Sequence, residues 1–254
     1  MIPELAAAIE RGESVVLATV VQSRRSVPRR PGAKMLIYSD GRILGTIGGG
    51  EMEHRVKLDA AEVLLDGKPR LSNYSLVDPS EGDPGVCGGE VDIYLEPYMP
   101  QTPLYVIGAG HVGHAVSDLA QWLGFKTMVW DDRSEVLETV VEAEHADVAM
   151  SGAIANAIEQ HPVSADASIV VVTRNVALDL EILPHLLATP ARYIGLMGSL
   201  RRWEKTRTGL AKMGIGDDDL DRVQAPIGVE IHAETPAEIA VSIMAAVIGN
   251  RRGT

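Results

Sequence analysis

A glycine-rich turn between an apolar strand and a helix is the feature that most limits what this chain can fold into. Residues 104–107 read LYVI, and residues 108–113 follow directly as GAGHVG, after which a helical pattern runs to about residue 123. In such a turn the first glycine permits a tight bend, the second lets a pyrophosphate approach the backbone, and the third lets the helix pack closely on the strand. The segment therefore predicts a Rossmann-type nucleotide-binding domain.

An acidic residue follows at the spacing that this motif requires. Asp131 ends the predicted strand 126–130, roughly 20 residues after Gly108, where a carboxylate can accept a hydrogen bond from a ribose hydroxyl. Arg133 stands just beyond it and leaves the choice between NAD and NADP open. The residues expected to contact a nucleotide are Gly108, Gly110, His111, Gly113 and Asp131. Binding of NAD(P) itself is a separate question, because a fold does not decide a function.

A proline-rich segment divides the chain into two parts of different character. Three prolines within residues 97–103 favour an extended connector, because proline lacks an amide donor and restrains its predecessor. Short strand-like runs rich in glycine precede the connector, whereas apolar strands alternate with helical stretches after it, as in a parallel sheet covered on both faces. We therefore expect a smaller α+β domain over residues 1–97, a linker over 98–103 and a Rossmann-like α/β domain over 104–254.

Local patterns place further elements. A capping box, with Thr235 as the N-cap and Glu238 three residues later, predicts the start of the last helix. A helix that begins at Glu51 is expected to end at Gly67. The arginine- and proline-rich residues 24–32 are expected to form no regular element. Other strands are expected at residues 14–21, 33–38, 42–47, 70–77, 90–96, 168–172 and 193–196.

Composition narrows the range of partners. Lys and Arg number 23 against 35 Asp and Glu, and the resulting net charge of −12 argues against a nucleic-acid partner, which normally binds to a basic face of a protein.

The first residues lack the pattern of a signal peptide and no apolar stretch is long enough to span a bilayer, so we expect a cytoplasmic protein without membrane contact. A single cysteine excludes an intrachain disulfide and a four-thiolate zinc site, and no other metal site is expected. The sequence does not decide whether the chain forms a homodimer.

Two features of the N-terminal part suit an anion. Arg24, Arg25, Arg29 and Arg30 fall within seven residues, and guanidinium groups bind phosphate and carboxylate well. The alternative for these arginines is a solvated, ion-paired loop. Residues 48–50 are three consecutive glycines in front of an expected helix, where their amides either form an anion-binding nest or belong to a tight turn.

The lone cysteine, Cys87, lies in a stretch rich in glycine and proline. A single cysteine is commonly a small buried apolar group. In a loop, backbone amides can instead stabilise its thiolate and make it reactive. Both interpretations stay open from the residues alone.

Seven short blocks along the chain resemble the XdhC/CoxI family, the accessory proteins of molybdenum hydroxylases such as xanthine dehydrogenase. They are residues 18–21 (ATVV), 26–33 (SVPRRPGA), 47–53 (IGGGEME), 87–89 (CGG), 108–113 (GAGHVG), 193–199 (YIGLMGS) and 233–240 (AETPAEIA). The blocks occur in the order of the family and cover nearly the whole chain. This chain departs from the family at Gly50, where many members have a cysteine, and at His232, where a glycine is usual.

The resemblance implies a chaperone for the molybdenum cofactor rather than an enzyme. Members of the family bind the molybdopterin form of the cofactor, protect it while a cysteine desulfurase supports its sulfuration, and insert it into the apo-hydroxylase. Molybdopterin is an anionic, phosphorylated dithiolene, which suits the arginine and glycine segments. The resemblance assigns this cofactor to Arg29, Arg30, Gly48, Gly49, Gly50, Glu51 and Cys87.

Two other functions stay open. The first is an NAD(P)-dependent oxidoreductase that uses the glycine turn and Asp131, but such an enzyme also needs a proton-handling group, and neither His111 nor His185 stands in a partnered arrangement. The second is an interaction module in which the glycine turn is structural only.

Overall fold

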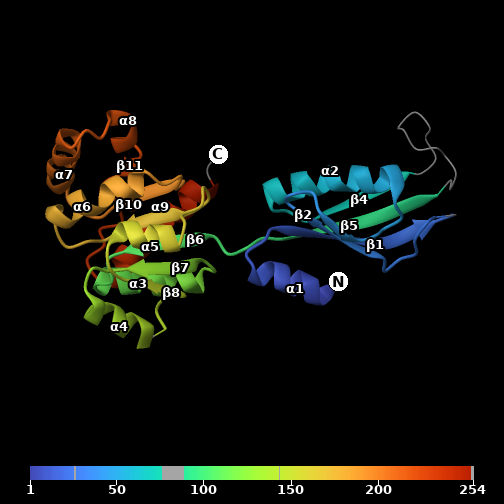
Figure 1. Ribbon diagram of the computed structural model, residues 1–254, viewed down its shortest axis with the longest axis horizontal. Helices are drawn as coiled ribbons and strands as arrows, with labels where there is room; N and C mark the ends of the chain where they lie inside the picture. The colour runs from blue at the N-terminus through green and yellow to red at the C-terminus, as the bar shows by residue number, and fades with distance from the viewer. Residues whose placement is uncertain (26, 76–88, 143, 253–254) are drawn as a thin grey trace. The chain divides into compact units, whose positions relative to one another are not determined.

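The computed structural model divides the chain into two compact units, Met1–Pro100 and Gln101–Thr254 (Figure 1). It describes four stretches of the 254-residue chain, namely residues 1–25, 27–75, 89–142 and 144–252. Each unit has its own sheet and its own apolar core. In the described stretches, no helix combines the length and the apolar content that crossing a membrane requires.

The N-terminal unit is built on a five-stranded antiparallel sheet with the strand order β3-β2-β1-β5-β4. Its helices are α1 (Ile2–Glu10) and α2 (Gly50–Asp66), and its strands are β1 (Val15–Arg24), β2 (Lys34–Tyr38), β3 (Ile43–Gly45), β4 (Arg70–Ser75) and β5 (Glu90–Tyr98). The central position of β1 explains why its apolar run is buried on both faces.

Different helices cover the two faces of this sheet. Successive side chains of a strand point to opposite faces, so Val16 of β1 belongs to one apolar cluster with Val56 of α2, whereas Leu17 belongs to another with Leu5 of α1. α2 ends at Gly67, whose left-handed φ of 65° confirms the predicted C-cap.

β1 is longer than its sequence pattern predicts. Beyond an irregularity in the register between Val20 and Gln22, it continues to pair with β5 as far as Arg24, which lies opposite Glu90. Nη1 of Arg24 donates to Oε2 of Glu90 at 3.3 Å. The expectation that residues 24–32 contain no regular element is therefore wrong at Arg24, because pairing with a strand far away in the sequence extends β1.

The C-terminal unit is built on a six-stranded parallel sheet with the strand order β11-β10-β9-β6-β7-β8. Its strands are β6 (Pro103–Ile107), β7 (Lys126–Trp130), β8 (Val148–Met150), β9 (Ser168–Val171), β10 (Tyr193–Leu196) and β11 (Val223–Gln224). Its helices are α3 (His111–Trp122), α4 (Ser134–Glu142), α5 (Ile154–Gln160), α6 (Val176–Leu187), α7 (Leu200–Lys212), α8 (Asp217–Leu220) and α9 (Pro236–Arg252).

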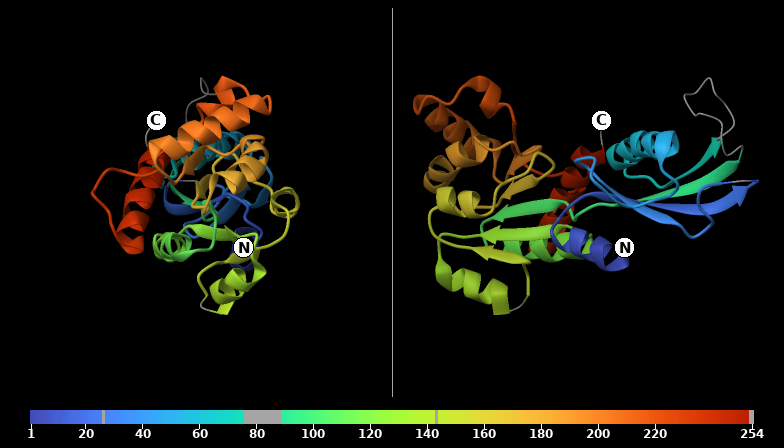
Figure 2. Two further views of the ribbon diagram at one scale, coloured as in Figure 1. Left: turned by 90° about the vertical axis from the view of Figure 1, so that its left-hand side faces the viewer. Right: turned by 45° about the vertical axis from the view of Figure 1, so that its right-hand side comes forward.

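Helices cover both faces of this parallel sheet, which confirms the predicted Rossmann-like fold (Figure 1, Figure 2). One apolar cluster joins the strands to α5, α6 and α7, and the other joins them to α3, α4 and α9. At the start of α9, the Glu238 amide donates to the Thr235 hydroxyl at 3.3 Å and the Thr235 amide donates to Oε2 of Glu238 at 2.9 Å. The predicted capping box is therefore confirmed.

The strand order determines where a ligand site is expected. From β6 the chain adds β7 and β8 on one side and then β9, β10 and β11 on the other, so the order reverses between β6 and β9. Ligands of open α/β sheets bind beyond the carboxyl ends of the strands at such a reversal. Residues 108–113, after β6, and Thr173, after β9, lie at this edge.

Candidate functional site at the carboxyl edge of the parallel sheet

The glycine turn connects the end of β6 to the start of α3. Packing requires two of its glycines, because a Cβ on Gly108 would lie 2.8 Å from the carbonyl oxygen of Val172 and one on Gly113 would lie 1.9 Å from the carbonyl oxygen of Gly108. Gly110 differs, since its φ is −78° and an added Cβ would meet no described atom within 4 Å. Neither the bend nor the packing explains Gly110, and the open space beside it suits a ligand.

Asp131, at the end of β7, holds this turn in place. Only 2% of its surface is exposed. Its Oδ2 accepts a hydrogen bond from the amide of Ala109 at 2.7 Å, and its Oδ1 accepts from the amide and Nε of Arg133 at 3.0 and 2.9 Å. A ribose hydroxyl would have to share this carboxylate with Arg133, so the contact of Asp131 with a nucleotide stays a prediction.

A second ion pair spans the strand reversal. Arg174, which follows β9, donates from both terminal nitrogens to the two carboxylate oxygens of Asp132, each at 2.6 Å. The hydrogen bonds from Arg174 hold the pKa of Asp132 at about 2, below its ordinary value. Both side chains line a cavity of about 190 Å³ together with Gly108, Gly110 and Asp131.

A buried ion pair joins the helices that follow β9 and β10. Arg202 of α7 donates from Nη2 to Oδ1 of Asp179 at 2.7 Å, from Nε to Oδ2 at 2.9 Å, and from Nη1 to the carbonyl oxygen of Thr173 at 3.0 Å. The Asp179 side chain is fully buried and that of Arg202 is 17% exposed. This pair was not predicted from the sequence, although an aspartate in the first turn of the apolar helix α6 was a signal for it.

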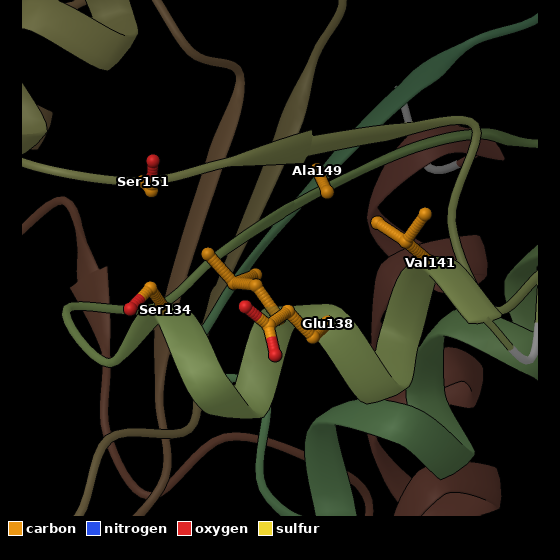
Figure 3. Close-up of a pocket in the computed structure, with 6 residues that line it drawn as sticks. Ser134, Glu138, Val141, Ala149 and Ser151 are labelled. Atoms are coloured by element: carbon orange, nitrogen blue, oxygen red, sulfur yellow. The ribbon is translucent and has the colours of Figure 1, made fainter.

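Further hollows lie outside the glycine turn. One of about 500 Å³, at the starts of α6 and α7, shares Arg174 with the first cavity. Another, of about 340 Å³, lies between α4 and the edge strand β8 (Figure 3), with mainly apolar walls that include Val141 and Ala149 and with the carboxylate of Glu138 at its side. This groove contains no predicted site residue, so it is not part of the candidate site.

In the N-terminal unit, residues 48–50 turn the chain into α2. Their φ values are 146°, 81° and 65°, which lie in the region that favours glycine. A Cβ on Gly48 would lie 3.2 Å from the Cβ of Pro28, so the turn lies beside the arginine-rich loop. Arg29 and Arg30 follow Pro28 and are exposed. The structure therefore brings together the two segments that the sequence assigns to an anion.

An anion from the chain itself already occupies this turn. Oε1 of Glu53 accepts hydrogen bonds from the hydroxyl of Thr46 at 2.6 Å and from the amides of Ile47 and Gly49 at 3.1 and 2.8 Å. Burial alone would raise the pKa of Glu53, but these hydrogen bonds outweigh it and hold the pKa below the ordinary 4.5. A phosphate at these amides would have to displace Glu53, so the predicted role of residues 48–50 in binding stays a prediction.

The remaining predicted residues occupy different places. His111 is exposed at the first position of α3, and Glu51 is half-buried in the first turn of α2. Cys87 lies outside the described residues. His232 has a φ of 55°, in the left-handed region that favours glycine, so the glycine that the family resemblance leads us to expect here would suit this backbone.

Both parts of the chain match models of known protein families. Residues 104–247 match the XdhC Rossmann domain, and residues 8–75 match the XdhC and CoxI family. A structure described as a xanthine dehydrogenase from Bacillus halodurans shares 24% sequence identity, with a TM-score of 0.54, over 98% of this chain and 95% of that chain. At this level of identity, the similarity to the solved structure supports the fold of this chain and not its function.

Two curated proteins of Escherichia coli K12 are similar over most of the chain. The uncharacterized protein YqeB is 33% identical over 91% of this chain, which spans only 42% of the length of YqeB. The molybdenum cofactor insertion chaperone PaoD is 24% identical over 96% of this chain and 86% of its own length.

Replacing Glu53 should destabilise the N-terminal unit. Because its pKa is lowered in the folded state, the ionised carboxylate stabilises the fold above about pH 4.5, and this contribution is lost as the pH falls through the lower folded-state value. We expect Glu53→Gln to cost about 1–3 kcal/mol at pH 7 and to flatten the acid side of the stability profile measured by calorimetry. Glu51→Gln, in the same helical turn, is the control; equal profiles for the two variants would contradict the assignment.

Breaking the buried pair at Asp179 should destabilise the C-terminal unit more strongly. Asp179→Asn leaves the guanidinium of Arg202 buried without a carboxylate, and we expect a loss of about 3–5 kcal/mol. All three tryptophans, Trp122, Trp130 and Trp203, belong to this unit, so tryptophan fluorescence during urea unfolding reports on it alone.

The control for this experiment is Arg207→Gln, which removes exposed ion pairs with Asp217 and Asp221. Surface pairs contribute little to stability, so the unfolding midpoint should hardly move. An Asp179→Asn midpoint as close to wild type as that of the control would show that the buried pair is not important for the fold.

Proposed function

The chain belongs to the XdhC and CoxI family, and from this we propose that it is an accessory protein that binds molybdenum cofactor, supports its sulfuration and inserts it into a hydroxylase of the xanthine dehydrogenase type. The observation that carries the proposal is the similarity to the insertion chaperone PaoD along nearly the whole chain. The partners are then an apo-hydroxylase, which receives the cofactor, and a cysteine desulfurase, which supplies the sulfur. The protein itself acts as a carrier and not as an enzyme.

We assign the phosphate of the cargo to the arginine-rich loop of the N-terminal unit. Arg29 and Arg30 are exposed, and guanidinium groups bind phosphate through paired, charge-assisted hydrogen bonds. The glycine turn lies beside this loop, since a Cβ added to Gly48 would come within 3.2 Å of Pro28. Glu53 satisfies amides of the turn, so the arginines are the groups left to receive the phosphate.

A nucleotide site in the C-terminal unit is the second part of the proposal, and the open space at Gly110 favours it. The start of α3 supplies amides and a positive dipole end for a diphosphate. The cavity of about 190 Å³ is smaller than the roughly 300–1,000 Å³ of most ligand sites, so a dinucleotide such as NAD(P) would extend beyond it. The residues fit a diphosphate better than they fit a ribose, because the oxygens of Asp131 already have donors.

Changing Arg29 and Arg30 together to Gln should weaken cofactor binding at least tenfold, because two charge-assisted contacts are lost. The measurement is a fluorescence titration with molybdopterin cofactor, followed by activation of an apo-hydroxylase. The control is the double variant Lys57→Gln and Lys68→Gln, which removes the same charge from the same unit.

Each result of this experiment decides a different point. Equal affinity of the arginine variant and wild type would remove these arginines from the proposal. Failure of the wild-type protein both to bind the cofactor and to activate the hydroxylase would overturn the chaperone function. Reduction or oxidation of NAD(P) with a substrate would favour an oxidoreductase instead.

Gly110→Ala should separate ligand binding from folding at the glycine turn. The added methyl group has room and an allowed φ, so the melting temperature should not change, while a bound diphosphate would meet that methyl group. We expect calorimetric binding of ADP or NAD to weaken at least tenfold. Gly113→Ala is the contrasting variant, which should lower the melting temperature because its Cβ clashes with Gly108. Unchanged nucleotide affinity of Gly110→Ala would place the nucleotide elsewhere.

A further inference from the structure

The hollow at the starts of α6 and α7 has an unusual charge for this protein. Its volume is about 500 Å³, within the range of small-molecule sites. Four cationic side chains line it, and the rest of its lining is uncharged: Arg174, Arg201, Arg202 and Lys205, with Asn175, Val176 and Ser199. The chain as a whole carries a net charge of −12, so this hollow concentrates the opposite sign.

The backbone around this hollow is positive as well. α6 and α7 pack against each other and both begin here, with Asn175 and Ser199 as their N-caps (Figure 1). The amino end of a helix carries partial positive charge and normally attracts acidic side chains. α7 has no acid in its first turn and instead has Arg201 and Arg202 there, followed by Lys205. These cations oppose the dipole, and an anion in the hollow would offset both.

Two of the four cations are already neutralised. Arg202 pairs with Asp179, and Arg174 pairs with Asp132. By contrast, Arg201 and Lys205 are exposed and form no salt bridge with any acidic side chain in the described stretches. They are four residues apart, so they lie on the same face of α7. Arg202, which its buried pair holds in place, and these two exposed cations all line the hollow.

We propose that this hollow binds a phosphate-type oxyanion of a small phosphorylated ligand, held by Arg201 and Lys205. The residues of this site belong to the C-terminal unit, whereas the cofactor site is assigned to residues of the N-terminal unit. Arg174 also lines the cavity of the glycine turn, so the two cavities share this residue. Two acids line the cavity of the glycine turn, and each has a cationic partner: Asp132 pairs with Arg174 and Asp131 pairs with Arg133.

Inorganic pyrophosphate is the probe for this site, measured by calorimetry at low ionic strength with the full chain. We expect binding that weakens as salt is added. The double variant Arg201→Gln and Lys205→Gln should bind pyrophosphate at least tenfold more weakly. Its melting temperature without pyrophosphate should equal or exceed that of wild type, because cations are removed from a helix amino end.

The matched control is the double variant Lys126→Gln and Lys212→Gln, which loses the same charge at the first residue of β7 and the last residue of α7. Its affinity should stay within twofold of wild type. Equal affinity of the Arg201 and Lys205 variant and wild type would overturn the proposal, as would absence of binding to the wild-type protein. Loss of binding in Gly110→Ala but not in the Arg201 and Lys205 variant would place the phosphate at the glycine turn and also overturn it. Cofactor transfer, tested separately through Arg29 and Arg30, does not depend on these results.

Discussion

The hydrogen bonds of the Asp131 carboxylate are the interaction on which the arrangement of residues at the carboxyl edge of the parallel sheet depends. It ties the amide of Ala109, in the glycine turn after β6, to the end of β7, and it carries Arg133 as its counter-charge. A buried carboxylate is tolerated only when it is paired and hydrogen-bonded, and both conditions are met here. Asp179 repeats the arrangement with Arg202 at the ends of β9 and β10. Residues of these pairs also line the cavities at this edge, Asp131 and Arg133 at the glycine turn and Arg202 at the starts of α6 and α7.

Acidic residues outnumber basic ones in this chain, yet the sites proposed above are proposed for anions. The reason is that several carboxylates form hydrogen bonds or ion pairs with groups of the protein itself and so do not repel an anion. Glu53 accepts hydrogen bonds from amides of the N-terminal glycine turn, and Asp179 forms an ion pair with Arg202. The cations left over then decide the charge of each proposed site: Arg29 and Arg30 in the N-terminal unit, and Arg201 and Lys205 at the start of α7. Net charge therefore argues against a broad basic surface but does not predict the sign of the charge in a small hollow.

Much of the fold was predictable from local patterns. The glycine turn, the alternation of strands and helices, and the capping box of Thr235 and Glu238 each depend on neighbouring residues, and each has the predicted form in the structure. The extension of β1 to Arg24 was not predictable, because it depends on pairing with Glu90 of β5. The site was predictable only as a location: the spacing of Asp131 indicated the strand end, but not that its oxygens already have donors.

The sequence by itself determined that this chain has a Rossmann-like unit with a glycine turn at its ligand edge, because a turn of that kind is a local requirement of the backbone. It also carried the ordered blocks that identify the family. Only the tertiary structure decided which charged groups are free to act, since Arg202 and Asp179 lie on different helices and meet only after folding. Packing also separated Gly113, which the fold requires, from Gly110, which leaves room for a ligand. Local spacing determines the backbone, whereas long-range contacts determine which side chains remain available.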